Sequence, residues 1–121
     1  MDVGQSTAIG LYQQAVAGTF QMDRDAARKC AEIYQRFAES VDKMVKDSNQ
    51  LQRLSGFGSF ASSLALQAGF ERKGAALAEA LLGIQEAAIR MAAAYLRAGG
   101  HIEEAEGMNT LAIKTASGLS Q

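Results

Sequence analysis

The stretch Leu54-Ser55-Gly56-Phe57-Gly58-Ser59-Phe60 (LSGFGSF) separates two long segments that both have helical periodicity. The apolar residues before it recur at steps of three, four and seven: Cys30, Ile33, Phe37, Val41, Met44 and Leu51. The seam after it alternates steps of four and three: Leu77, Leu81, Ile84, Ala88, Met91, Tyr95 and Ala98. Gly56 and Gly58 accept backbone angles that other residues resist, so the stretch predicts a turn that folds the two helices antiparallel, with Phe57 at the open end.

The rest of the chain extends this hairpin into a single all-α domain over residues 1–121. Asp23 is a helix-capping residue, and Gly99 followed by Gly100 is a typical helix stop. We expect the following elements: a short helix at about 6–18, a long helix at about 23–54, the turn at 55–59, a long helix at about 60–98, and a short C-terminal helix or tail at 101–121.

The glycines also match the loose spelling of a dinucleotide-binding fingerprint, from Gly56 to Ala61. That fingerprint requires a strand that enters the glycines and a helix whose N-terminus faces a pyrophosphate. Here the preceding segment, DSNQLQRL, is polar and helical in its periodicity. The turn is therefore the favoured interpretation, and we expect no cofactor.

Composition narrows the function classes further. The chain has no proline, one cysteine, and a net charge of −1, which does not favour a nucleic-acid-binding surface. Its N-terminus has neither the basic segment nor the apolar core of a secretory signal peptide. Charged residues interrupt every apolar stretch before it reaches the ~18 residues of a membrane span, so we expect a soluble chain.

Residues capable of catalysis or metal binding are few. His101 is the only histidine and lies beside a Gly-Gly pair, where we expect an exposed side chain. Cys30 lies on an apolar helical stripe and is expected to be a small buried side chain. The acidic group at 103–106 is expected to be a solvated helix face, and Glu86 and Arg90 an ordinary surface ion pair. We therefore predict no enzyme, no catalytic residue and no metal site.

A second apolar stripe gives the strongest indication of function. Leu82, Ile89 and Leu96 repeat every seven residues beside the first seam, and two stripes imply two packing partners. The short N-terminal helix is long enough to shield only part of this surface. We therefore expect a partner interface formed by Leu82, Ile89 and Leu96 with Phe57 and Phe60 at the tip, occupied by another helical protein or by a second copy of the chain.

Three segments carry a resemblance to a known family that covers about Thr19 to Gly100: GTFQMDRDAARK, LSGFGSFASSLALQAGFERKGAALAEAL and MAAAYLRAGG. They are similar to the helix entry, the turn with second helix, and the helix end of the ESAT-like, Trp-x-Gly family of small type VII secretion substrates in actinobacteria and other Gram-positive bacteria. The resemblance implies two long helices that pair with a partner hairpin into a four-helix bundle.

Two departures from the family pattern bear on function. Phe57 stands where the family has its tryptophan. The Tyr-x-x-x-Asp/Glu export signal is missing, because Val16, Ala38 and Gly99 follow the three tyrosines at the fourth position. In such systems one member of a pair carries the signal, so the resemblance implies a signal-less partner.

The function implied by the resemblance is a type VII (ESX-like) substrate, or a targeting or chaperone partner of another helical hairpin or of the helical N-terminal domain of an exported toxin. The chain would be cytoplasmic before export and secreted or at the cell surface afterwards. The alternative is a cytoplasmic homodimeric helical assembly module unrelated to secretion. A membrane-active effector fits less well, because the second long helix is rich in alanine and has no basic polar face.

Overall fold

The computed structural model describes residues 2–51, 58 and 61–118, which form four α-helices and no strand. The helices are α1 (Gln5–Ala17), α2 (Arg24–Gln50), α3 (Ala61–Ala98) and α4 (Ile102–Ala116). The predicted all-α fold is confirmed. The C-terminal segment, expected as a helix or a tail, is a helix through Ala116.

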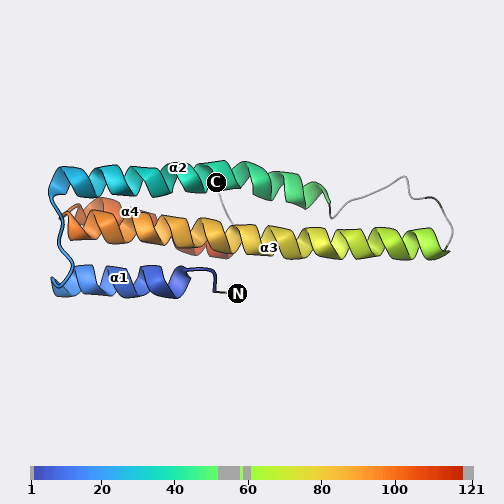
Figure 1. The fold of residues 1–121 in the computed structure, drawn as a ribbon, viewed down its shortest axis with the longest axis horizontal. Helices are drawn as coiled ribbons and strands as arrows, with labels where there is room; N and C mark the ends of the chain where they lie inside the picture. The colour runs from blue at the N-terminus through green and yellow to red at the C-terminus, as the bar shows by residue number, and fades with distance from the viewer. Residues whose placement is uncertain (1, 52–57, 59–60, 119–121) are drawn as a thin grey trace.

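The long helix α3 is the centre of the fold (Figure 1). The backbones of α1, α2 and α4 each pack against α3, and in the described part of the chain these three backbones do not approach one another. Helix α2 runs antiparallel to α3 and forms the hairpin, whereas α1 and α4 cover only the C-terminal half of α3. The N-terminal part of α3 extends past the last residue of α2 (Figure 1).

The helix ends follow the chemistry that the sequence predicts. The Asp23 carboxylate accepts a hydrogen bond from the backbone amide of Ala26 at 3.1 Å, which begins α2. Gly18 ends α1 at φ 82°, and Gly100 follows α3 at φ 83°; both angles lie in the left-handed region that glycine accepts. Helix α2 ends at Gln50 with Leu51 as its C-cap residue, and residues 52–54 of the predicted helix lie outside the described residues.

The core is built largely of alanine. Fourteen of the eighteen buried hydrophobic residues in the described part of the chain are alanines, and the others are Val41, Val45, Ile89 and Leu96. Alanine lets helix backbones approach closely. At Gly74, where α3 meets the end of α2, a Cβ would lie only 3.1 Å from the carbonyl carbon of Leu51. Aromatic rings fill the wider spaces, with Tyr34 stacked on Tyr95 at a centroid distance of 5.6 Å.

Helix α4 covers the second stripe of α3. Leu96 clusters with Ala31 of α2 and Ala105 of α4, and Ile89 clusters with Ala38 of α2 and Ala112 of α4. Ile89 is 3% exposed and Leu96 is 2% exposed. The partner interface that the sequence suggested for these two residues does not fit this arrangement, because neither can meet a partner while α4 is docked.

The turn between α3 and α4 is fixed by a buried histidine, which corrects the expectation of an exposed one. His101 is 5% exposed. Its Nε2 donates to the carbonyl of Arg24 at 2.9 Å, and its Nδ1 accepts from the Arg28 guanidinium at 3.0 Å. Because a carbonyl only accepts and a guanidinium only donates, these partners select the tautomer with its proton on Nε2.

Arg28 also forms a two-pronged ion pair with Glu104 of α4, with both N···O distances at 2.8 Å. The hydrogen bond from Arg28 lowers the pKa of the Glu104 carboxyl. Since the pKa in the folded state lies below that of the unfolded chain, the pair stabilises the fold above the unfolded-state pKa. This contribution is lost as pH falls through the folded-state value.

We predict that His101→Leu lowers the free energy of unfolding by about 1–3 kcal/mol, because the Arg24 carbonyl loses the donor that the buried imidazole supplies and the partly exposed Arg28 guanidinium loses one acceptor. Urea unfolding followed by circular dichroism would measure the change. Ile102→Ala, at an exposed neighbouring position, should change stability by less than about 0.5 kcal/mol. Equal effects of the two substitutions would contradict a structural role for the imidazole.

Candidate helix-docking face

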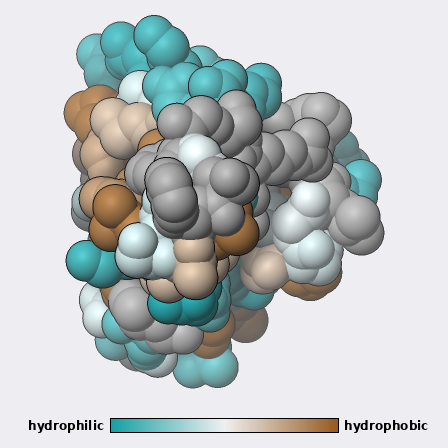
Figure 2. All heavy atoms as spheres, turned by 90° about the vertical axis from the view of Figure 1, so that its right-hand side faces the viewer, coloured by the Kyte–Doolittle hydropathy of each residue, from teal (hydrophilic) through white to brown (hydrophobic). Residues whose placement is uncertain are grey.

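An apolar row lies exposed along α3. Leu66, Phe70 and Leu77 are separated by four and seven residues, which places them on one side of the helix. Ile84 and Met91 continue the row at further steps of seven. A view toward the end where α3 extends past α2 shows hydrophobic residues at the surface among hydrophilic ones (Figure 2).

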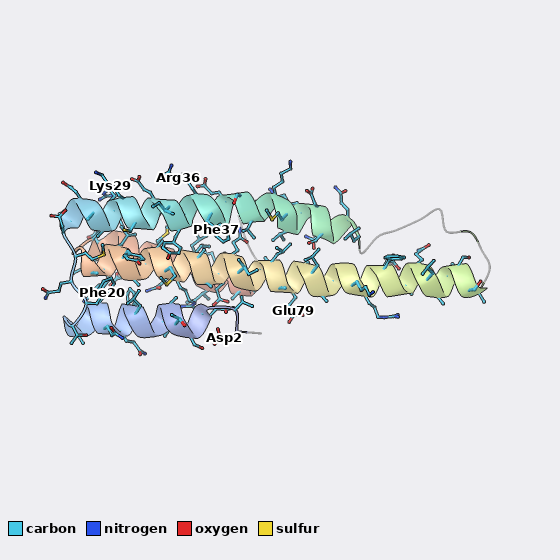
Figure 3. The ribbon with its side chains drawn as sticks, viewed as in Figure 1. Asp2, Phe20, Lys29, Arg36, Phe37 and Glu79 are labelled. Carbon is cyan, nitrogen blue, oxygen red and sulfur yellow. The ribbon has the colours of Figure 1, made fainter. Side chains whose placement is uncertain are left out.

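A second exposed row lies along α2. Phe37, Met44 and Leu51 are spaced by seven, with Ile33 one turn before them. Phe37 lies on the side of α2 that faces α3, whereas the labelled Lys29 and Arg36 point away from it (Figure 3). Together the two rows hold six large apolar side chains that are between 41% and 55% exposed: Phe37, Met44, Leu51, Leu66, Phe70 and Leu77. These six residues are called the docking face below.

The two rows meet in a groove of about 310 Å³ between α1, α2 and α3. Phe37 and Tyr34 of α2 form one wall, Ile84 and Met91 of α3 form the floor, and Val3 and its neighbours at the start of α1 close one end.

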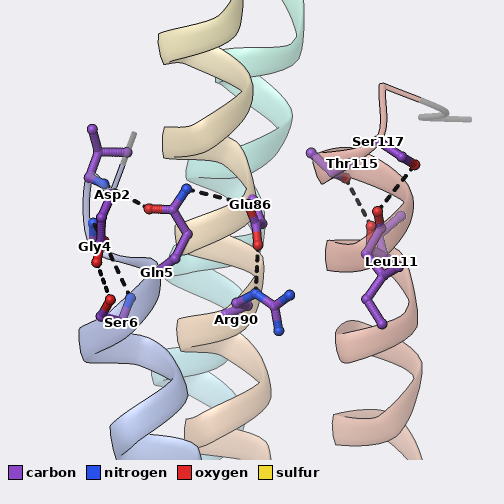
Figure 4. A network of polar contacts seen from close by, with 11 residues as sticks. Asp2, Gly4, Gln5, Ser6, Glu86, Arg90, Leu111, Thr115 and Ser117 are labelled. Atoms are coloured by element: carbon purple, nitrogen blue, oxygen red, sulfur yellow. Dashed lines mark hydrogen bonds and ion pairs between the residues drawn. The ribbon is translucent and has the colours of Figure 1, made fainter.

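A polar network fixes where α1 begins and so where the groove is closed (Figure 4). The Asp2 carboxylate accepts from the backbone amide of Gly4 at 3.0 Å and from the Ser6 hydroxyl. The side-chain amide of Gln5 donates to the carboxylate of Glu86 on α3 at 3.3 Å, and this carboxylate forms an ion pair with Arg90 at 2.8 Å. The Glu86–Arg90 pair is thus largely buried beneath α1 and is not the surface pair that the sequence suggested.

A second groove, of about 480 Å³, lies between α2 and α4 and is more polar. Glu39 and Asp42 line it on the α2 side, and Met108 and Leu111 on the α4 side. Gln85 at its base donates to the carbonyl of Ala38 at 3.0 Å. The described residues contain no group of three histidine, cysteine, aspartate or glutamate side chains placed to hold a metal ion.

The residues that the sequence predicted for the site lie in different environments, and some of them lie outside the described part of the chain. Gly56, Phe57 and Phe60 lie outside the described residues, and Gly58 has the positive φ, 89°, that was expected of the turn glycines. Leu82 is partly buried, and Ile89 and Leu96 belong to the core. Phe37, Met44, Leu51 and Leu77 were seen in the sequence as apolar rows but were not identified as an interface.

The fold and this surface define the chain as an all-α protein built on a helical hairpin with an exposed apolar face. Comparison with protein-family models, with curated proteins and with solved structures finds no match. Within the described residues, no helix has an apolar stretch long enough to cross a bilayer.

Proposed function

We propose that this protein acts by binding another helical protein through the docking face, as a small component of a type VII (ESX-like) secretion system. Its role there is that of a secreted substrate or of a targeting or chaperone partner of another helical substrate or toxin. The observation that supports binding to another protein is the pair of exposed apolar rows on α2 and α3. Single exposed apolar residues are ordinary on protein surfaces, but aligned rows on adjacent helices are typical of a helix-binding groove.

The size of the docking face supports this proposal. Six half-exposed large side chains offer roughly 600 Å² of apolar surface to a partner, close to the ~800 Å² per partner of a standard stable interface. The polar residues around them would supply the remainder. Phe37 and the bottom of the adjacent groove provide a recess for an anchoring side chain of the partner.

The secretion role rests on the resemblance of Thr19–Gly100 to the ESAT-like family, whose members pair as helical hairpins. A protein that lacks the tyrosine-based export signal and has an exposed hairpin face suits the signal-less member of such a pair. The homodimeric assembly module would use the same face, and gel filtration of the protein alone at several concentrations separates it from a hetero-partner.

We predict that Phe37→Glu and Leu77→Glu each reduce co-purification with the cognate partner, sought among proteins encoded by adjacent genes, by about tenfold or more. A carboxylate buried against an apolar partner helix loses its hydration without gaining a counter-charge. Because both side chains are half-exposed in the unbound protein, helical content by circular dichroism should stay near that of the wild type.

Ile113→Glu is the matched control, since Ile113 is an exposed apolar residue on α4, away from the docking face. It should leave co-purification unchanged. Wild-type yields for both Phe37→Glu and Leu77→Glu would show that the partner binds elsewhere.

A further inference from the structure

A row of basic residues borders the docking face along α2. Lys29, Arg36 and Lys43 are spaced by seven residues, so they form a straight row on the helix, and all three are exposed. Arg36 directly precedes Phe37, and Lys43 directly precedes Met44, which places this row beside the apolar row on its outer side. Figure 3 shows Lys29 and Arg36 directed away from α3.

Lys29, Arg36 and Lys43 form no ion pair with another described residue. The ion pairs between described residues involve Arg28, Lys46 and Arg90 as the cations. Arg36 makes only a long contact, 3.5 Å, to the backbone carbonyl of Glu32. Glu32 and Glu39 lie on α2 farther around the helix from Phe37 than the basic row does, since each residue advances the helix by about 100°.

The opposite border of the docking face, on α3, carries no acidic residue to balance this row. The residues that border Leu77 and Phe70 there are Gly69, Lys73, Ala76 and Ala80. Lys73 is exposed, so it adds a further positive charge at the end of the face. Asp25 and Asp47 are the acidic residues on the same border of α2, one at each end of the basic row.

We infer that the partner on the docking face is an amphipathic helix of a different protein that carries acidic residues beside its apolar seam, at heptad spacing. This inference rests on the proposed function and specifies its partner. In paired helices, the charged positions that border the apolar seam select the partner and its register. A basic row of Lys29, Arg36 and Lys43 selects acidic residues in the facing positions.

A second copy of the chain does not supply that complement. If α2 lies against the α2 of a second copy, the basic row meets the same basic row. If α2 lies against the α3 of a second copy, the row meets small residues and Lys73. Like charges placed opposite one another act against the self-pair and leave the docking face to a helix of opposite charge.

The experiment uses the full-length protein and two synthetic helical peptides of about 21 residues, or three heptads. Both peptides have leucine at the seam; one has glutamate at the bordering positions, and the other has lysine there. Fluorescence anisotropy at about 50 mM salt, where surface charges are weakly screened, gives both dissociation constants. We expect the glutamate peptide to bind about tenfold more tightly or better, with the difference shrinking as salt is raised.

Charge reversal then assigns the effect to this row. Arg36→Glu combined with Lys43→Glu should remove or invert the preference for the glutamate peptide. Arg72→Glu combined with Lys114→Glu is the control, because it changes the net charge equally at two exposed positions outside the row. The control variant should keep the wild-type preference.

Each other outcome overturns the inference in a distinguishable way. Equal affinity for both peptides, together with loss of cognate-partner binding in Phe37→Glu, would refute the acidic partner and leave the proposed function standing. A failure of both peptides to bind would refute the inference as well. A homodimer that Phe37→Glu converts to a monomer would assign the docking face to a second copy.

Discussion

Leu96→Ala is expected to lower the free energy of unfolding by about 2–5 kcal/mol, which is a large part of the stability of a domain of this size. Among the residues that the structure describes, Leu96 is the largest fully buried side chain, and it packs between Ala31, Ala92 and Ala105 of three different helices. The buried residues around it are alanines, whose side chains are too short to fill the cavity, and the larger residues Tyr12, Tyr34, Tyr95 and Met108 pack at the partly buried edge of the cluster. Urea unfolding monitored by circular dichroism would measure the loss.

Leu64→Ala removes the same atoms from a half-exposed position of α3 and serves as the control for this measurement. It should cost less than about 0.5 kcal/mol. A similar loss in both variants would mean that α4 does not hold Leu96 inside the fold.

Gly99→Ala is the second substitution expected to have a large effect, of about 1–3 kcal/mol or more. A Cβ at Gly99 would overlap the Cβ of Ala27, which is fully buried on α2. Both groups belong to rigid helix ends, so the clash is relieved only if α2 and α3 move apart. That movement would disturb the packing of the first turn of α2 against the end of α3.

The double variant Gly99→Ala with Ala27→Gly tests this contact directly. Removal of the Ala27 methyl should restore the space, so the loss in the double variant should be smaller than the sum of the two single losses by about 1 kcal/mol or more. Strictly additive losses would show that Gly99 and Ala27 are not in contact. Thermal unfolding of all four proteins would give the comparison.

The helical hairpin and its ends were predictable because they depend on local signals. Asp23 as a cap, Gly18 and Gly100 as stops, and helical periodicity over long stretches act within a few residues of the chain. The all-α class follows from the same signals. These features can be predicted without knowing which face of a helix packs against which neighbouring helix.

The assignment of core and surface was less predictable because large side chains were given the most weight. On α2 the buried row is Ala27, Ala31, Ala38, Val41, Val45 and Ser48, and the larger Phe37, Met44 and Leu51 lie on an exposed row beside it. In this protein the small side chains face the core. They bury little apolar area each, but they let the helices approach closely, and the resulting van der Waals contacts compensate for that small area.

The docking of α4 was missed for the same physical reason. Of its large aliphatic residues, Ile102 and Ile113 are exposed and Leu111 is only partly buried. The residues that α4 directs inward recur at steps of four and three: His101, Ala105, Met108, Ala112 and Thr115. That regular spacing was the available signal, and it would have placed Ile89 and Leu96 inside the fold.

A core built mainly of alanine has a thermodynamic consequence for the stability of the chain. Unfolding such a core exposes little apolar surface per residue, so the heat-capacity change and the denaturant sensitivity should both be small for a chain of this length. The folded population of the lone chain then changes gradually with temperature. A partner of the kind proposed above, if it binds only the folded form, would add its own binding free energy to this shallow curve, so the folded fraction would rise with the concentration of that partner.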